Sequence, residues 1–173
     1  MKIEELDDLI LIWGPLSRQG LFYLQEEELG RNLRVLVPEN RPFMIGLMHN
    51  IPFLKKNGIR SVYCTDNMLG FLFYKRKISE LLLFCKEVRE KEMTGYCGSL
   101  FAVFLAKLHG AGIRIFHQGE LTANFTDTDA STLSGKKFIS PGQEYLVCRP
   151  EDERIEKDLV AGDIGSMKKE AVQ

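Results

Sequence analysis

Five short apolar runs, separated by longer segments, constrain the fold of this chain more than any other feature. Their sequences are LILIW (9–13), LRVLVPE (33–39), IRSVYCT (59–65), ISELLLFC (78–85) and IRIFH (113–117). Runs this short and this uniformly apolar are typical of strands that are buried on both faces. Because they recur at intervals of roughly 25 residues with helix-like segments between them, they predict parallel strands joined by right-handed crossovers.

The intervening segments predict helices at 16–29, 42–57, 67–74 and 99–110. The last of these, SLFAVFLAKLHG, is apolar most of the way round and ends at a glycine, which suits a helix C-terminus. Pro52 lies inside the second expected helix, where we expect a kink or a break. The alternation predicts an α/β fold: a three-layer, Rossmann-like domain whose mostly parallel sheet has helices on both faces.

The pattern changes after the fifth run. Residues 118–142 are rich in Thr, Ser, Asp and Gly, which predicts a long loop, and EYLVC (144–148) predicts a short final strand. The end of the chain is charged and poor in large apolar residues, so we expect a short helix near 151–160 and then a loose tail. These patterns predict one domain over residues 1–149 and an irregular C-terminal extension over 150–173, partly helical or mobile.

Composition and charge exclude several classes of function. Apolar residues make up 45% of the chain, charged residues 27%, and the net charge is -1, with acids and bases interspersed. The sequence contains no basic stripe of the kind that would predict binding to nucleic acid. Its apolar stretches are also much shorter than the roughly 18 residues of a membrane helix. The four cysteines are scattered without a CxxC pair, so they predict reduced thiols in a cytoplasmic protein. The chain lacks GxGxxG, GxxxxGK[ST] and GxSxG motifs, and we expect no cofactor and no metal.

The expected sheet also predicts where a ligand would bind. In an open parallel sheet, ligands bind beyond the carboxyl ends of the strands. Here those ends are followed by segments 14–17, 39–42, 65–67, 85–87 and 117–120. A further anion site is expected where the 99–110 helix begins, because the first N–H groups of a helix are free. The candidate ligand-binding residues are Glu39, Arg41, Asn67, Lys86, Gly98, Ser99 and His117, and Asp66 is the candidate catalytic residue.

Structural interpretations of the same residues remain open. Asp66 lies in YCTDNMLG, between two apolar runs, where it is also suited to cap the helix at 67–74. Arg41 is expected to pair with Glu39. Lys86 and the following Glu87 are expected to form an exposed ion pair, which contributes little to stability.

Three segments, in this order along the chain, resemble segments of one protein family. They are VLVPENRPFMIG, VYCTDNMLGFLF and GSLFAVFLAKLHGAGIRIF. They are similar to the family's Glu-x-Arg-Pro segment, its Thr-Asp-Ser/Asn-Met-x-Gly segment and its Gly-Thr-Tyr helix with the strand that follows. The family comprises methylthioribose-1-phosphate isomerase, ribose-1,5-bisphosphate isomerase and the alpha, beta and delta regulatory subunits of translation initiation factor 2B. The resemblance covers about residues 9–117 and corresponds to the C-terminal Rossmann-like domain of those longer proteins.

The resemblance implies that most of the isomerase site is missing. The family's catalytic Cys matches Gly14, and a Gln that contacts phosphate matches Ile45. The phosphate-binding Asn-Lys pair matches Gly95-Tyr96, and an Asp-Arg segment matches Lys86-Glu87. Of the catalytic pair only the Asp is retained, as Asp66, so the resemblance implies a catalytically degenerate site.

Two functions from different classes follow from this pattern. The first is a regulatory module similar to the initiation-factor subunits, which binds a phosphorylated small molecule weakly or not at all and acts through self-association. Members of the family pair through this domain, so a homodimer is the expected partner arrangement. The second is a sugar-phosphate aldose-ketose isomerase-like enzyme that uses Asp66 as acid/base, with Lys86, Cys97 or His117 replacing the missing groups.

Overall fold

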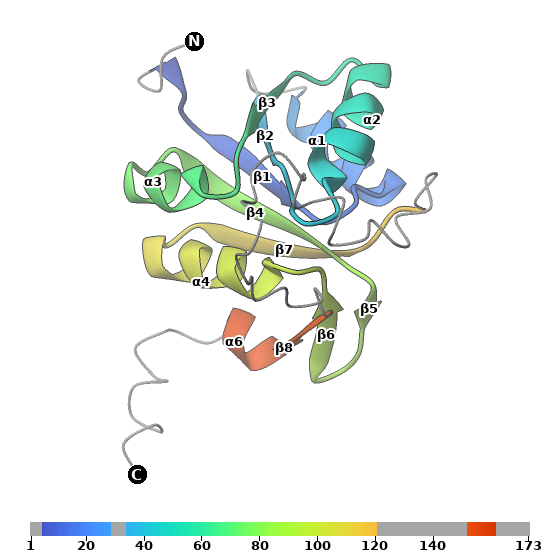
Figure 1. Cartoon of the computed structure of the whole chain (residues 1–173), viewed down its shortest axis with the longest axis vertical. Helices are drawn as coiled ribbons and strands as arrows, with labels where there is room; N and C mark the ends of the chain where they lie inside the picture. The colour runs from blue at the N-terminus through green and yellow to red at the C-terminus, as the bar shows by residue number, and fades with distance from the viewer. Residues whose placement is uncertain (1–4, 29–33, 121–151, 162–173) are drawn as a thin grey trace, which may run out of the picture.

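The chain forms a five-stranded parallel sheet flanked by helices. The computed structural model describes residues 5–28, 34–120 and 152–161 (Figure 1). The strands of the main sheet are β1 (Leu9–Trp13), β2 (Arg34–Pro38), β3 (Ser61–Cys64), β4 (Ile78–Cys85) and β7 (Gly112–His117), and they lie in the order β3-β2-β1-β4-β7. All four neighbouring pairs are parallel. The strand order reverses between β1 and β4, where such folds bind ligands.

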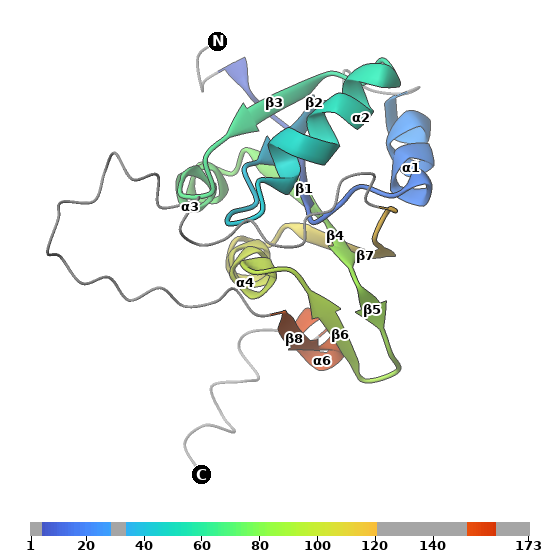
Figure 2. The same ribbon diagram turned by 45° about the vertical axis from the view of Figure 1, so that its right-hand side comes forward.

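Helices cover both faces of this sheet, as Figures 1 and 2 show. One face carries α3 (Met68–Tyr74) and α4 (Ser99–His109), and the other carries α1 (Arg18–Glu28) and α2 (Ile51–Lys56). Alternate residues of β1 divide between the two sides: Leu9, Leu11 and Trp13 pack into one core cluster, and Ile10 and Ile12 into the other. The predicted three-layer Rossmann-like fold is therefore confirmed.

The second predicted helix is wrong in detail. Residues Gly46–Asn50 form a π-helical turn, and α2 begins only at Ile51, with Pro52 in its first turn. Pro52 lacks an N–H group, so a helix start accommodates it, whereas a helix interior would not. Gly46 is required here, because a Cβ at this position would lie 1.8 Å from the Pro38 carbonyl oxygen. This close approach holds the turn against the end of β2.

A second, smaller sheet was not predicted. It consists of β5 (Glu87–Val88), β6 (Glu92–Gly95) and β8 (Glu153–Glu156), which pair antiparallel in the order β5-β6-β8 and lie below the main sheet in Figure 1. The helix expected near 151–160 is therefore wrong over β8, and only α6 (Lys157–Ala161) is helical. Ile155 of β8 is 1% exposed and belongs to the core on the α3/α4 side. Residues of the C-terminal extension thus pack as part of the domain.

Two expectations for the end of the chain concern residues that the structure does not describe. The predicted loop over most of 118–142 and the strand at 144–148 lie outside the described residues. Across the described ranges, no helix is long and apolar enough to cross a membrane.

Candidate functional site

Asp66 lies at the carboxyl edge of the sheet and organises the loop after β2. Its two carboxylate oxygens accept hydrogen bonds from the backbone N–H groups of Asn40 and Arg41, both at 2.8 Å. The Oδ1 atom of Asn40, a residue with a φ of 53°, in turn accepts the N–H of Gly14 at 3.0 Å. A chain of hydrogen bonds thus connects the residues that follow β1, β2 and β3.

The expectation that Asp66 caps α3 through its side chain is therefore wrong. Asn67 occupies the N-cap position and makes no side-chain hydrogen bond to the helix, since the Asp66 carboxylate is used by the neighbouring loop. Burial raises the pKa of Asp66, and the two backbone N–H groups oppose that rise without cancelling it. The expected pair of Glu39 and Arg41 is confirmed, with 2.8 Å between Oε2 and Nε.

The N-terminus of α4 is occupied by a carboxylate of the chain itself. Glu153 of β8 accepts the N–H of Gly98 at 2.8 Å and the N–H of Leu100 at 2.6 Å, one with each oxygen. These N–H groups are the ones expected to face an anion, and the expectation that they are free at Gly98-Ser99 is wrong. The negative charge of Glu153 satisfies both the unpaired N–H groups and the helix dipole.

Trp13 restricts the same turn. Gly98 has a φ of 84°, and a Cβ at this position would lie 2.3 Å from the Cζ2 atom of the Trp13 indole. Glycine is therefore required twice over, for the left-handed backbone and for the contact with the ring. This packing places the end of β1 directly beneath the first turn of α4.

The other predicted site residues are dispersed. Lys86 forms an ion pair with Asp152 and lies 4.6 Å from the centre of the Tyr96 ring, so the expected pair with Glu87 is wrong; Glu87 pairs with Arg89. His117 is exposed at the end of β7. The structure thus brings together Glu39, Arg41 and Asp66. Lys86 and Glu153 instead make contacts elsewhere, with Asp152 and with the first turn of α4.

Cys97 does not have the properties of an activated nucleophile. Burial raises the pKa of its thiol, and the nearby carboxylates of Glu153 and Asp66 raise it further. A nucleophilic cysteine needs the opposite shift, since the thiolate is the reactive form. The Cys64 and Cys85 thiols are also buried, which raises the pKa of each to about 12.

Three buried polar atoms near this edge have no hydrogen-bond partner among the described residues. They are Trp13 Nε1, Asn40 Nδ2 and Ser99 Oγ. Asn40 Nδ2 and Trp13 Nε1 are donors, and both residues flank the start of the β1–α1 connection. An oxygen of a small ligand is the group that such donors would bind.

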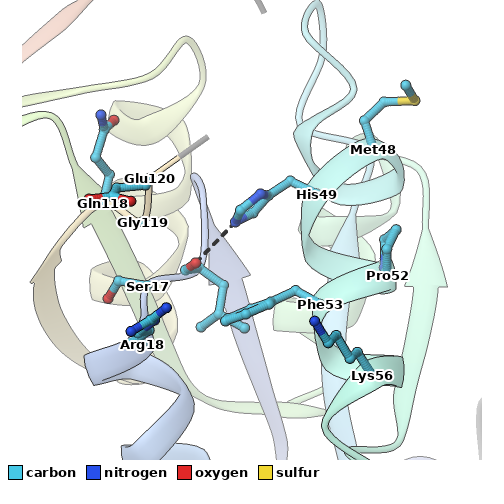
Figure 3. A pocket seen from close by; sticks show the side chains of 11 residues that line it. Ser17, Arg18, Met48, His49, Pro52, Phe53, Lys56, Gln118, Gly119 and Glu120 are labelled. Atoms are coloured by element: carbon cyan, nitrogen blue, oxygen red, sulfur yellow. Dashed lines mark hydrogen bonds between the residues drawn. The ribbon is translucent and has the colours of Figure 1, made fainter. Parts of the chain in front are cut away.

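A cavity of about 630 Å³ opens beside this connection, on the α1/α2 side of the sheet (Figure 3). One wall is the start of α1, with the segment after β7 beside it, and the opposite wall is the π-helical turn with α2. His49 Nε2 lies 3.0 Å from the Leu16 carbonyl oxygen and connects the walls. The cavity is lined by Leu16, Ser17, Arg18, Met48, His49, Pro52, Phe53, Lys56, Gln118, Gly119 and Glu120.

None of the eight predicted site residues lines this cavity. Two of the five strand-end segments do contribute to it, 14–17 and 117–120, so the strand-end rule located part of its wall. Arg18 and Lys56 were missed because they belong to helices. Only knowledge that α1 and α2 lie side by side would have brought them together.

The chain is thus a Rossmann-like α/β domain with a polar edge at the carboxyl ends of its strands. No known family profile matches the sequence. The chain is 30% identical over 84 residues to methylthioribose-1-phosphate isomerase of Petrotoga mobilis, and 28% identical over 112 residues to that of Koribacter versatilis. These matches confirm the resemblance found in the sequence: the chain is similar to part of the methylthioribose-1-phosphate isomerases.

Solved structures show the same fold. The chain resembles subunit delta of translation initiation factor eIF-2B from A. fulgidus, with a TM-score of 0.70 and 20% identity over 91% of this chain. It resembles 5-methylthioribose 1-phosphate isomerase from Pyrococcus horikoshii OT3 with a TM-score of 0.69 and 15% identity over 94% of this chain. The chain spans 52% and 51% of those two chains, and 24% and 30% of the two sequence relatives. This partial coverage fits a match to one domain of longer proteins.

Proposed function

We propose that this chain is a cytoplasmic, catalytically inactive relative of the isomerases that acts as a self-associating binding module for a phosphorylated small molecule. The observation that carries the proposal is an apolar surface on α3 and α4, which we call the α3/α4 face. Each of its six large side chains is between 37% and 68% exposed. They are Met68, Phe71 and Tyr74 on α3, and Phe101, Phe104 and Leu108 on α4.

The spacing of these residues makes two stripes. The three on α3 recur every three residues, and those on α4 recur at three and four, so each set lies along one side of its helix. The two helices pack against each other, and Figure 2 shows them side by side on one face of the sheet. Exposed apolar stripes on two helices that pack together typically mark an interaction site.

A second copy of the chain is the occupant that we propose. A two-fold axis places the same patch on both partners, so an apolar patch meets its own equivalent. The Lys75 ammonium lies 5.6 Å from the centre of the Phe71 ring and 5.5 Å from that of the Tyr74 ring, where it adds a cation–π contact. Pairing through this domain is also what the family resemblance implies.

The residues around Asp66, where the resemblance places the isomerase site, support the absence of catalysis. Both Asp66 oxygens are held by backbone N–H groups, the Cys97 thiol is kept protonated, and Glu153 fills the N-terminus of α4. An isomerisation of this type needs an acid/base pair and a place for phosphate. Glu153 would repel a phosphate at the first turn of α4.

The alternative is an aldose-ketose isomerase-like enzyme with Asp66 as acid/base. The raised pKa of Asp66 favours it, since proton transfer near neutral pH needs a carboxyl whose pKa lies above its usual range. The unpartnered donors of Trp13 and Asn40 favour it as well, since they would bind a substrate oxygen.

Incubation with methylthioribose-1-phosphate, the compound named for the sequence relatives, distinguishes the two functions. We expect no ketose by NMR above the rate without protein, for the wild type and for Asp66→Asn alike. Conversion by the wild type that Asp66→Asn abolishes would establish the enzyme instead.

A further inference from the structure

The cavity between α1 and α2 is lined by two cationic side chains that are not part of the site around Asp66. Arg18 and Lys56 lie on opposite walls, as Figure 3 shows, and both are exposed. Within the described ranges, neither side chain forms an ion pair. The one acidic residue of the lining, Glu120, lies away from both in the same view. This end of the cavity therefore has an uncompensated positive charge.

Neutral donors add to this charge. Ser17 is 8% exposed, and its Oγ accepts the N–H of Gly20 at 3.3 Å, which leaves the hydroxyl proton free to donate. Gln118 also lines the cavity, and its Oε1 atom accepts a hydrogen bond from the Tyr96 hydroxyl. The N–H groups of Arg18 and Gln19, in the first turn of the 11-residue α1, have no partner within the helix.

The rest of the lining is apolar. Leu16, Met48, Pro52 and Phe53 contribute carbon surface, and the Phe53 ring stacks on His49 with 5.8 Å between ring centres. The volume of about 630 Å³ lies within the roughly 300–1,000 Å³ typical of small-molecule sites. Its combination of paired cations, directed donors and a carbon wall suits an organic dianion.

We propose that this cavity binds a small phosphate monoester with an apolar or aromatic body. Arg18 and Lys56 hold the phosphate from opposite walls, with Ser17 donating a further hydrogen bond. Phe53 and Pro52 pack against the carbon part. A phosphate rather than a carboxylate fits, since two separate cations and several donors match a dianion with three terminal oxygens. Binding at this place deepens the proposed function, because it supplies a ligand site that is separate from the one blocked by Glu153.

Isothermal titration of the full chain with phenyl phosphate tests this proposal, with inorganic phosphate as the probe for the anion alone. We expect saturable binding of phenyl phosphate below about 10 mM, and weaker binding of inorganic phosphate because it lacks the carbon part. The double variant Arg18→Gln/Lys56→Gln should bind phenyl phosphate at least about tenfold more weakly. Lys55→Gln, on the same helix but outside the lining, should bind like the wild type.

Three results would overturn the proposal. They are no binding of phenyl phosphate, equal binding of phenyl and inorganic phosphate, and unchanged binding by the double variant. The variants exchange exposed cations for a neutral residue of similar length, so they are expected to fold, which thermal unfolding checks. Sedimentation of the same double variant separates this proposal from the proposed function, since Arg18 and Lys56 lie on the opposite side of the sheet from the α3/α4 face. If phenyl phosphate does not bind but the chain still self-associates, only the proposed cavity ligand is ruled out.

Discussion

Glu153 joins two segments that are far apart in the sequence. Its carboxylate accepts the N–H groups of Gly98 and Leu100, 55 and 53 residues away. Hydrogen bonds between a carboxylate and helix N–H groups are among the stronger ones, since the charge and the helix dipole reinforce each other. One side chain therefore fixes β8 against α4 and also removes an anion site.

Replacement of Glu153 by Ala should destabilise the fold. Loss of both hydrogen bonds leaves the first turn of α4 unsatisfied, and we expect the free energy of unfolding to fall by about 1–3 kcal/mol. Glu156→Ala, an exposed position on the same strand, is the control and should change stability by less than about 0.5 kcal/mol. Urea unfolding measures both; equal effects would show that the Glu153 contacts do not stabilise the domain.

Asp66 should make stability depend on pH. Its pKa is raised above 3.8 in the folded state, so folding favours the protonated carboxyl. The stability from this group is complete below its unfolded pKa and is lost as the pH rises through the higher folded value. Asp66→Asn does not titrate, so the stability of the wild type relative to this variant should decrease as the pH rises from about 3.8 towards neutral. A relative stability that increases over this range would mean that the folded pKa lies below 3.8.

At the scale of the elements, periodicity predicted the main sheet well. The bounds of β1 and β4 match the apolar runs, because both strands are central and buried. The β5–β6 hairpin could not be predicted, since it is short, charged and exposed on one side. The charged pattern over 151–160 predicts a helix, whereas Glu153–Glu156 pair with β6 as a strand and bury Ile155 in the core. Tertiary contacts there override local propensity.

Ile155 tests whether β8 is part of the folded domain. The side chain is 1% exposed in the α3/α4-side core, so Ile155→Ala should reduce the free energy of unfolding by about 2–4 kcal/mol, and Ile155→Val by about 1 kcal/mol. Thermal or urea unfolding gives both values. Wild-type stability in Ile155→Ala would mean that β8 does not pack against the core in solution.

Across the whole molecule, the chain has the fold of the solved structures that it resembles, while its charges and exposed surfaces define separate regions. The strand-end rule and the family resemblance predicted Asp66 and its edge of the sheet. They could not predict Glu153, because that contact depends on a pairing between β6 and β8, nor Arg18 and Lys56, because these meet only when α1 and α2 pack side by side. At the sheet edge near Asp66, Glu153 occupies the N-terminus of α4; the cavity lies on one side of the sheet, and the α3/α4 face lies on the other.

The α3/α4 face gives the most direct test of whether the chain works by association rather than by catalysis. Sedimentation velocity of the wild type at about 50 µM should show a dimer, since burial of aromatic side chains dominates the energetics of such interfaces. Phe71→Glu/Phe104→Glu places charges at exposed positions of both stripes and should sediment as a folded monomer. Phe22→Glu, an exposed aromatic on α1 at the opposite side, should remain a dimer. A monomeric wild type, or a dimer that the double variant leaves intact, would contradict self-association through the α3/α4 face.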